Sequence, residues 1–109
     1  MSNKSLGEFE EIVLLTVAIL YEDAYGVSIK KDIETRLNRN VSVGAMRTAL
    51  SRLEKKGYLK SHFGEVTKER GGKRKRYFRV TQPGKTALEE VMESRKKLWD
   101  AIPAMSFDF

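Results

Sequence analysis

The chain has 109 residues, a formal net charge of +6, no cysteine and a single histidine, His62. This length supports one domain with a modest core, and the residue types exclude disulfides, thiolate zinc sites, cysteine nucleophiles and histidine-rich metal sites, so we expect no metal and no cofactor. The longest apolar stretch, residues 12–20, is too short to cross a membrane, and no signal-peptide segment follows the first four residues. We therefore expect a cytoplasmic protein without a membrane partner.

The positive charge is concentrated in the middle of the chain. The first 24 residues carry one base and five acids, residues 25–81 carry sixteen bases and five acids, and residues 82–109 carry four bases and five acids. Six bases fall within residues 68–76, a density that repels itself unless a polyanion neutralises it. This distribution favours a nucleic-acid surface between acidic ends that have another role, such as self-association. A surface that merely keeps the protein soluble is the alternative.

Three helices are predicted in the first half of the chain. Residues 6–22 contain no helix breaker after Gly7 and have apolar residues on several faces, which predicts a central, largely buried helix. A connection at residues 23–26 leads into a second helix, and Ser42 is a good N-cap for a third that Gly57 ends. The inward stripes of the second and third helices are Ile29, Ile33 and Leu37, and Met46, Leu50 and Leu53.

The pattern then changes to a period of two. Residues 58–65 and 75–81 read as two strands joined by a basic, glycine-containing loop, with Leu59, Ser61 and Phe63 on one face of the first strand. Thr81 is an N-cap candidate for a last helix, which Pro103 should stop. The order predicts a mainly α fold of the winged helix-turn-helix class: a three-helix core, a β-hairpin wing and a C-terminal helix. The expected divisions are a DNA-binding domain at 1–81 with its wing at 58–81, a dimerisation helix at 82–103 and an apolar tail at 104–109.

The outward face of the third helix suits the major groove of DNA, because its side chains are small, polar or basic. It consists of Gly44, Ala45, Arg47, Thr48, Ser51, Arg52 and Lys55. The alternative is an ordinary solvated face, which more typically carries Glu and Gln. We expect base contacts from Arg47 or Thr48.

The loop between the strands has the composition of a wing that contacts DNA. Its glycines let the backbone approach the sugar-phosphate wall, and its bases neutralise phosphates or reach the minor groove. The predicted contacts are Lys68, Arg70, Gly71, Gly72, Lys73, Arg74 and Lys75. Arg76 and Arg79, at the start of the second strand and within it, are alternatively expected to pair with carboxylates.

The last helix carries an apolar stripe that would be exposed in a monomer, and such patches mark interfaces. The stripe comprises Leu88, Val91, Met92, Leu98, Trp99 and Ile102, with Arg95 interrupting it. We therefore expect a homodimer, in which the acids Glu8, Glu10 and Glu11 of the first helix meet Lys96 and Lys97 of the second copy. Trp99 is read as dimer core rather than as a ligand contact.

No constellation of catalytic residues emerges. The acidic pairs at 10–11 and 89–90 are adjacent on helices and diverge by about 100°, which is poor for shared acid–base work. His62 is expected at the surface of its strand, with no acid or nucleophile near it in sequence. We expect no catalytic residues and no enzyme activity.

Several segments together resemble the PadR-like transcriptional regulators over about three quarters of the chain. They are LGEFEEIVLL (6–15), AYGV (24–27), SVGA (42–45), LEKKG (53–57), GGKR (71–74), YF (77–78) and VTQPG (80–84). The resemblance implies a homodimeric repressor on a palindromic operator, whose last helix packs on the partner's first and last helices. By that implication Tyr25 and Ser42 join the DNA-binding residues, and Leu6, Phe9, Val13 and Arg95 join the dimer interface.

The chain departs from the family pattern at two places. Arg47 stands where an aromatic residue, usually Tyr, is common, and Arg95 lies near the place of a ligand-binding Trp, with Trp99 one turn later. The sequence thus predicts a repressor that binds double-stranded DNA as a homodimer. The alternatives are a repressor with a pore for a small aromatic drug or metabolite at the dimer interface, and a winged-helix adaptor that binds protein and not DNA.

Overall fold

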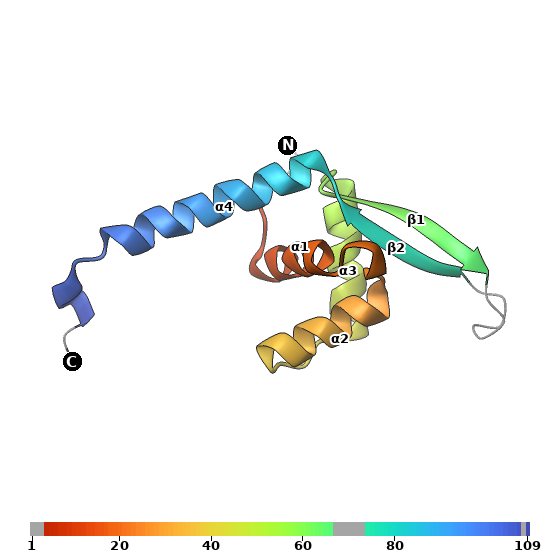
Figure 1. Ribbon diagram of the computed structural model, residues 1–109, viewed down its shortest axis with the longest axis horizontal. Coiled ribbons are helices and arrows are strands. Elements are labelled where there is room, and N and C mark those ends of the chain that lie inside the picture. The colour runs from red at the N-terminus through yellow and green to blue at the C-terminus, as the bar shows by residue number, and fades with distance from the viewer. Residues whose placement is uncertain (1–3, 67–73, 108) are drawn as a thin grey trace.

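The computed structural model describes residues 4–66, 74–107 and 109, and its elements follow the predicted order (Figure 1). They are α1 (Glu8–Leu20), a 3₁₀ turn (Tyr21–Asp23), α2 (Gly26–Leu37), α3 (Val43–Lys55), β1 (Leu59–Val66), β2 (Arg74–Val80), α4 (Gln82–Ala101) and a short 3₁₀ helix (Ala104–Phe107). The predicted fold class, a mainly α winged helix-turn-helix, is confirmed.

The core forms around α1, as its all-round apolar pattern predicts. Val13, Leu14 and Val17 are completely or almost completely buried there. The predicted stripes of the neighbouring helices pack against them, namely Ile29 and Ile33 of α2 and Met46, Leu50 and Leu53 of α3. The sheet contributes Leu59 and Phe78.

Two apolar residues that were expected to face inward are exposed. Leu37 is the last residue of α2, and the chain turns away at Asn38, which has a left-handed backbone (φ 50°). Phe63 lies in β1 opposite Arg76, whose guanidinium is 6.0 Å from the centroid of its ring, and the side chain is exposed. Both residues belong to the apolar stripe of their own helix or strand, but the described part of the fold does not cover their side chains.

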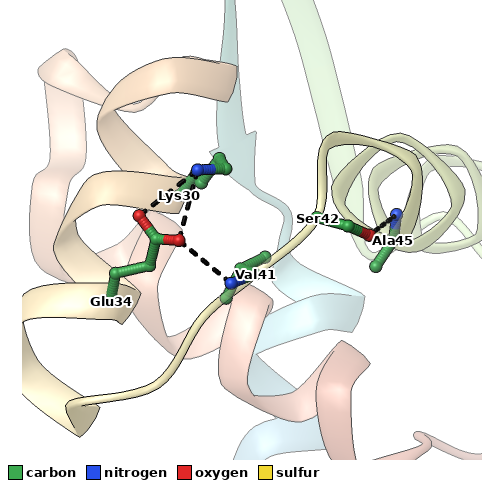
Figure 2. A network of polar contacts seen from close by, with 5 residues as sticks. All are labelled: Lys30, Glu34, Val41, Ser42 and Ala45. Atoms are coloured by element: carbon green, nitrogen blue, oxygen red, sulfur yellow. Dashed lines mark hydrogen bonds and ion pairs between the residues drawn. The ribbon is translucent and has the colours of Figure 1, made fainter.

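The turn between α2 and α3 is fixed by polar contacts (Figure 2). Glu34 accepts hydrogen bonds from the Val41 backbone N–H (3.0 Å) and from the Lys30 ammonium (3.2 Å). These two bonds, the Val41 bond foremost, hold the pKa of Glu34 below its ordinary value. Ser42 caps α3 as predicted, accepting from the Ala45 N–H at 3.0 Å. The contacts therefore set where α3 begins relative to α2.

The two strands form one antiparallel hairpin, with Leu59 opposite Val80, Phe63 opposite Arg76, and an irregularity between Phe63 and Val66. The hairpin is joined to the helices at its base, where the Phe78 N–H donates to the carbonyl of Ala24 at 2.8 Å. Its direction is therefore determined by the core rather than by the hairpin alone.

The hairpin and α4 leave the three-helix core in opposite directions (Figure 1). The radius of gyration is 16.6 Å, whereas a compact domain of this length has about 13 Å. Thr81 caps α4 as predicted, accepting from the Gly84 N–H at 3.1 Å, and its own N–H donates to Tyr58 O at 3.0 Å. Only Gly84 and Leu88 of α4 are buried, so most of this helix is an arm outside the core.

Candidate nucleic-acid interface

The outward face predicted for α3 is exposed throughout. This helix packs on the core through Met46, Leu50 and Leu53, so its opposite side faces solvent along its length. The exposed residues on that side are Gly44, Ala45, Arg47, Thr48, Ser51, Arg52 and Lys55, and Ser42 is exposed at the helix start. The face carries three cations and no carboxylate, so it suits a polyanion.

A hollow of about 530 Å³ runs beside this face, between α3, the start of α2 and the base of the hairpin. Arg47, Ser51 and Lys75 line it together with Tyr25. Sequence reasoning missed Val27 and Glu54, which also line it, because nothing in their local patterns indicates that α2 and the hairpin meet there.

Both carboxylate oxygens of Glu54 are already paired, so this side chain offsets little of the positive charge that lines the hollow. Its Oε1 accepts from Arg76 Nη2 at 2.7 Å, and its Oε2 accepts from Ser61 Oγ at 2.7 Å. Arg76 Nε in turn donates to Ser61 Oγ at 3.1 Å. The expectation that Arg76 pairs with a carboxylate is confirmed, and the network ties α3 to both strands. Arg79 instead lies over the ring of Tyr21, at 4.5 Å.

Tyr25 lies where α2 meets the hairpin and is half-buried. Its ring contacts Tyr77 edge-on at 5.6 Å, and the Lys75 ammonium lies 4.2 Å from its centroid. Tyr77 also stacks on His62, which is exposed as predicted, and an added Cβ at Gly64 would come within 2.7 Å of the Tyr77 ring. Tyr25 thus holds Lys75 at the edge of the hollow.

Most of the predicted wing residues lie outside the described residues. These are Lys68, Arg70, Gly71, Gly72 and Lys73. Of the remaining two, Arg74 is exposed at the start of β2 and Lys75 is half-buried against Tyr25.

The residues expected at the dimer interface separate into three groups by exposure. Leu98 and Trp99 are 72% and 68% exposed, and Met92 and Arg95 are also exposed, whereas Leu6, Phe9, Val91 and Ile102 are half-buried. Leu88 is buried against its own chain. Val13 has no exposed surface, so its placement at a dimer interface is wrong: the central position of α1 uses the side chain for the core.

The α1 acids, which were expected to meet Lys96 and Lys97 of a second copy, each have a partner within the chain. Glu8 pairs with Arg39 (3.4 Å), Glu10 with Lys56 (2.8 Å) and Glu11 with Arg95 (3.1 Å). Lys96 pairs with Asp100 (2.7 Å). Residues far apart in the sequence supply most of these partners, which explains why the sequence pattern did not identify them.

In the described part of the chain, no group of three or more His, Cys, Asp or Glu side chains is placed to hold a metal ion. Among the same residues, no helix has the length and apolar character needed to cross a membrane.

Comparisons with known proteins agree with this arrangement. An uncharacterized protein from Lysinibacillus sphaericus is 35% identical over 98 residues, covering 88% of this chain and 85% of that protein. The crystal structure of a PadR-like transcription factor from Bacteroides fragilis matches with a TM-score of 0.71 at 25% identity, covering 84% of each chain. A PadR family transcription regulator from Clostridium difficile matches with a TM-score of 0.62 at 29% identity, covering 82% of this chain and 91% of that one.

A family model supplies the assignment. The model of the transcriptional regulator PadR-like family matches residues 14–90, which include α2, α3, both strands and the first half of α4. On this match, the chain belongs to the PadR-like family of transcriptional regulators.

Proposed function

We propose that this protein is a repressor that binds an inverted-repeat operator in double-stranded DNA as a homodimer. The observation that carries the proposal is the exposed face of α3, which is small near its start, basic along its length and flanked by a hollow with Arg47 and Lys75 at its walls. A helix of this character fits the major groove, and the cations beside it fit the phosphates that line the groove.

The proposed roles follow from position on α3. Gly44 and Ala45 in the first turn let the helix backbone approach the bases, and Arg47 and Thr48 are close enough to the helix start to read base edges. Arg47 can donate to guanine O6 and N7 together. Arg52 and Lys55, further along, are assigned to backbone phosphates, together with Arg74 and Lys75 of the hairpin.

The dimer is proposed from the apolar side chains that α4 leaves uncovered. Leu98 and Trp99 are largely exposed, and Trp99 contacts Phe107 of the tail with ring centroids 6.2 Å apart. An arm with such a surface is expected to pack against a second copy. The proposed interface consists of Leu6, Phe9, Val91, Met92, Arg95, Leu98, Trp99 and Ile102. Sedimentation equilibrium at micromolar protein tests this part, and a species of monomer mass would refute it.

DNA binding is tested by retaining genomic DNA fragments on the purified protein, sequencing them, and measuring affinity for the recovered site by fluorescence anisotropy at several salt concentrations. Arg47→Ala is expected to cost about 1 to 3 kcal/mol on the recovered site and little on random DNA. Replacing Arg74 and Lys75 with Ala should weaken all sequences alike and flatten the salt slope by about 0.9 for each phosphate that the variant no longer neutralises.

Lys97→Ala is the matched control for Arg47→Ala, because it removes one positive charge from an exposed position of α4, and α4 extends away from α3 (Figure 1). The proposal predicts that this variant keeps the affinity and the salt slope of the original protein. Affinity for DNA that is weak and independent of salt would refute the proposal and favour the protein-binding adaptor.

A ligand-responsive repressor is a second candidate, supported by one observation. A hollow of about 450 Å³ lies between the N-terminal segment and α4, lined by Leu6, Tyr58, Val91, Arg95 and Leu98 among others. Trp99 does not line it, but Leu98 beside Trp99 does. Titration of the Trp99 fluorescence with planar aromatic compounds tests this candidate, and an unchanged spectrum at millimolar ligand would exclude such compounds.

A further inference from the structure

Glu10 is an acidic residue in the first turn of α1 that is almost completely buried, with 8% of its surface exposed. Its Oε1 accepts two hydrogen bonds, from the Gly7 N–H at 2.7 Å and from Lys56 Nζ at 2.8 Å. Lys56 Nζ also donates to the carbonyl of Ser5 at 2.7 Å. Oε1 therefore links the start of α1 to the end of α3 through these two hydrogen bonds.

The second oxygen has no such role. Glu10 Oε2 is buried and has no hydrogen-bond partner among the described residues. A buried carboxylate oxygen without a donor is costly, so native proteins rarely keep one without a further interaction. Burial by itself would raise the pKa of Glu10, but the hydrogen bonds from Lys56 and Gly7 and the charges of Lys56 and Arg52 together hold it below its ordinary value. The carboxylate is thus ionised at neutral pH, and Oε2 is free to accept a hydrogen bond from a further donor.

Arg52 is a second cation near Glu10, and its charge contributes to lowering the pKa of that carboxylate. It lines two hollows together with Glu10, one of about 560 Å³ that also has Lys55 and Lys56 at its wall and one of about 370 Å³ along the start of α3. Its side chain is exposed, and its guanidinium has no hydrogen bond or ion pair with any residue that the structure describes. Arg52 also belongs to the face of α3 that carries the proposed DNA contacts.

We propose that Glu10 is a positioning residue for Arg52 in the DNA complex, where the Arg52 guanidinium bridges Glu10 Oε2 and a backbone phosphate. The inference rests on the proposed DNA-binding function. A guanidinium has five N–H donors in a planar fork, so one edge can serve the carboxylate while the other serves the phosphate. DNA on α3 excludes water from this side of the helix, which strengthens both contacts.

A phosphate is the expected partner, rather than a base, because of where Arg52 lies. It is in the third turn of α3, beyond the residues near the helix start that reach base edges, and Lys55 follows one turn later. Glu10 would then link α1, which lies outside the helix-turn-helix unit, to the contact between α3 and the DNA backbone.

A double-mutant cycle tests the proposal. Glu10→Gln, Arg52→Ala and the double variant are compared with the original protein by anisotropy on the DNA recovered from the genomic selection, with unfolding in urea measured in parallel. We expect Glu10→Gln to weaken binding about three- to tenfold, Arg52→Ala to weaken it at least as much and to lower the salt slope by about 0.9, and the double variant to bind no more weakly than Arg52→Ala.

Lys56→Met is the control for a purely structural role of Glu10, because Lys56 is largely buried and holds the other carboxylate oxygen. It should lower the stability of the fold while leaving the DNA affinity near that of the original protein. Arg52→Lys, at an exposed position, tests the same link without touching the core. A lysine keeps the charge but not the fork, so the salt slope should persist while the effect of Glu10→Gln on binding disappears.

Equal losses from Glu10→Gln in the presence and absence of Arg52 would overturn the inference, as would a loss in Lys56→Met of the same size. In either case, intact binding and a normal Arg47→Ala effect would leave the proposed function standing. Failure of the original protein to bind DNA at all would overturn both.

Discussion

Gly84 is the position at which a single added methyl group should be most damaging. It lies in the first turn of α4, where the helix passes over the turn between α3 and β1. A Cβ at this position would overlap the carbonyl oxygen of Tyr58 and would lie 3.0 Å from Val80 Cγ1. The Tyr58 carbonyl is backbone, and it already accepts the Thr81 N–H at 3.0 Å, so it cannot move away without weakening that bond.

The expected cost of Gly84→Ala combines opposing effects. Overpacking costs about 1 to 3 kcal/mol, and loss of the bond to the Tyr58 carbonyl adds about 1 kcal/mol. Alanine recovers up to about 1 kcal/mol as the better helix former. The net loss of unfolding free energy is about 2 kcal/mol. With an unfolding entropy of about 2.1 cal/mol/K per residue, this lowers Tm by about 9 °C.

Thermal unfolding followed by circular dichroism measures the effect, with all variants at one protein concentration because dimerisation makes Tm depend on it. Gly44→Ala is the matched control, since a Cβ there meets nothing within 4 Å and the exchange should stabilise α3 by up to about 1 kcal/mol. The reasoning is refuted if Gly84→Ala unfolds at or above the temperature of the original protein, or if both exchanges lower Tm equally.

Three further predictions concern the helix cap, a buried acid and the network behind the hairpin. Ser42→Ala removes the acceptor for an α3 backbone N–H and should cost about 1 kcal/mol in urea unfolding, whereas a loss near zero would mean that water replaces the cap. Since the folded pKa of Glu10 lies below its ordinary 4.5, its ionised form stabilises the fold at neutral pH, and this contribution is lost as pH falls below about 4.5; unfolding curves of the original protein and Glu10→Gln should therefore converge in acid, and parallel pH profiles would contradict this. Arg76→Met breaks the partly exposed pair with Glu54 and should cost less than about 1 kcal/mol of stability while lowering DNA affinity, and unchanged affinity would show that the pair does not align the hairpin with α3.

The sequence by itself determined the elements, their order and the exposed face of α3. Ser42 and Thr81 cap helices as their side chains predict, and Gly57 adopts a left-handed backbone (φ 80°) after α3. These features depend on interactions within a few residues, so the local sequence is sufficient to predict them. The face of α3 follows for the same reason, because Met46 and Leu53 mark the opposite side of a regular helix.

The tertiary structure decided which partners the charged side chains have and which apolar residues are covered. The carboxylates of α1 pair with Arg39, Lys56 and Arg95, which are 31, 46 and 84 residues away. The same packing buries Val13 completely and leaves Phe63 uncovered, although both fit their local stripes. Periodicity specifies the direction of a side chain relative to its own helix or strand, but what lies in that direction depends on how distant elements pack.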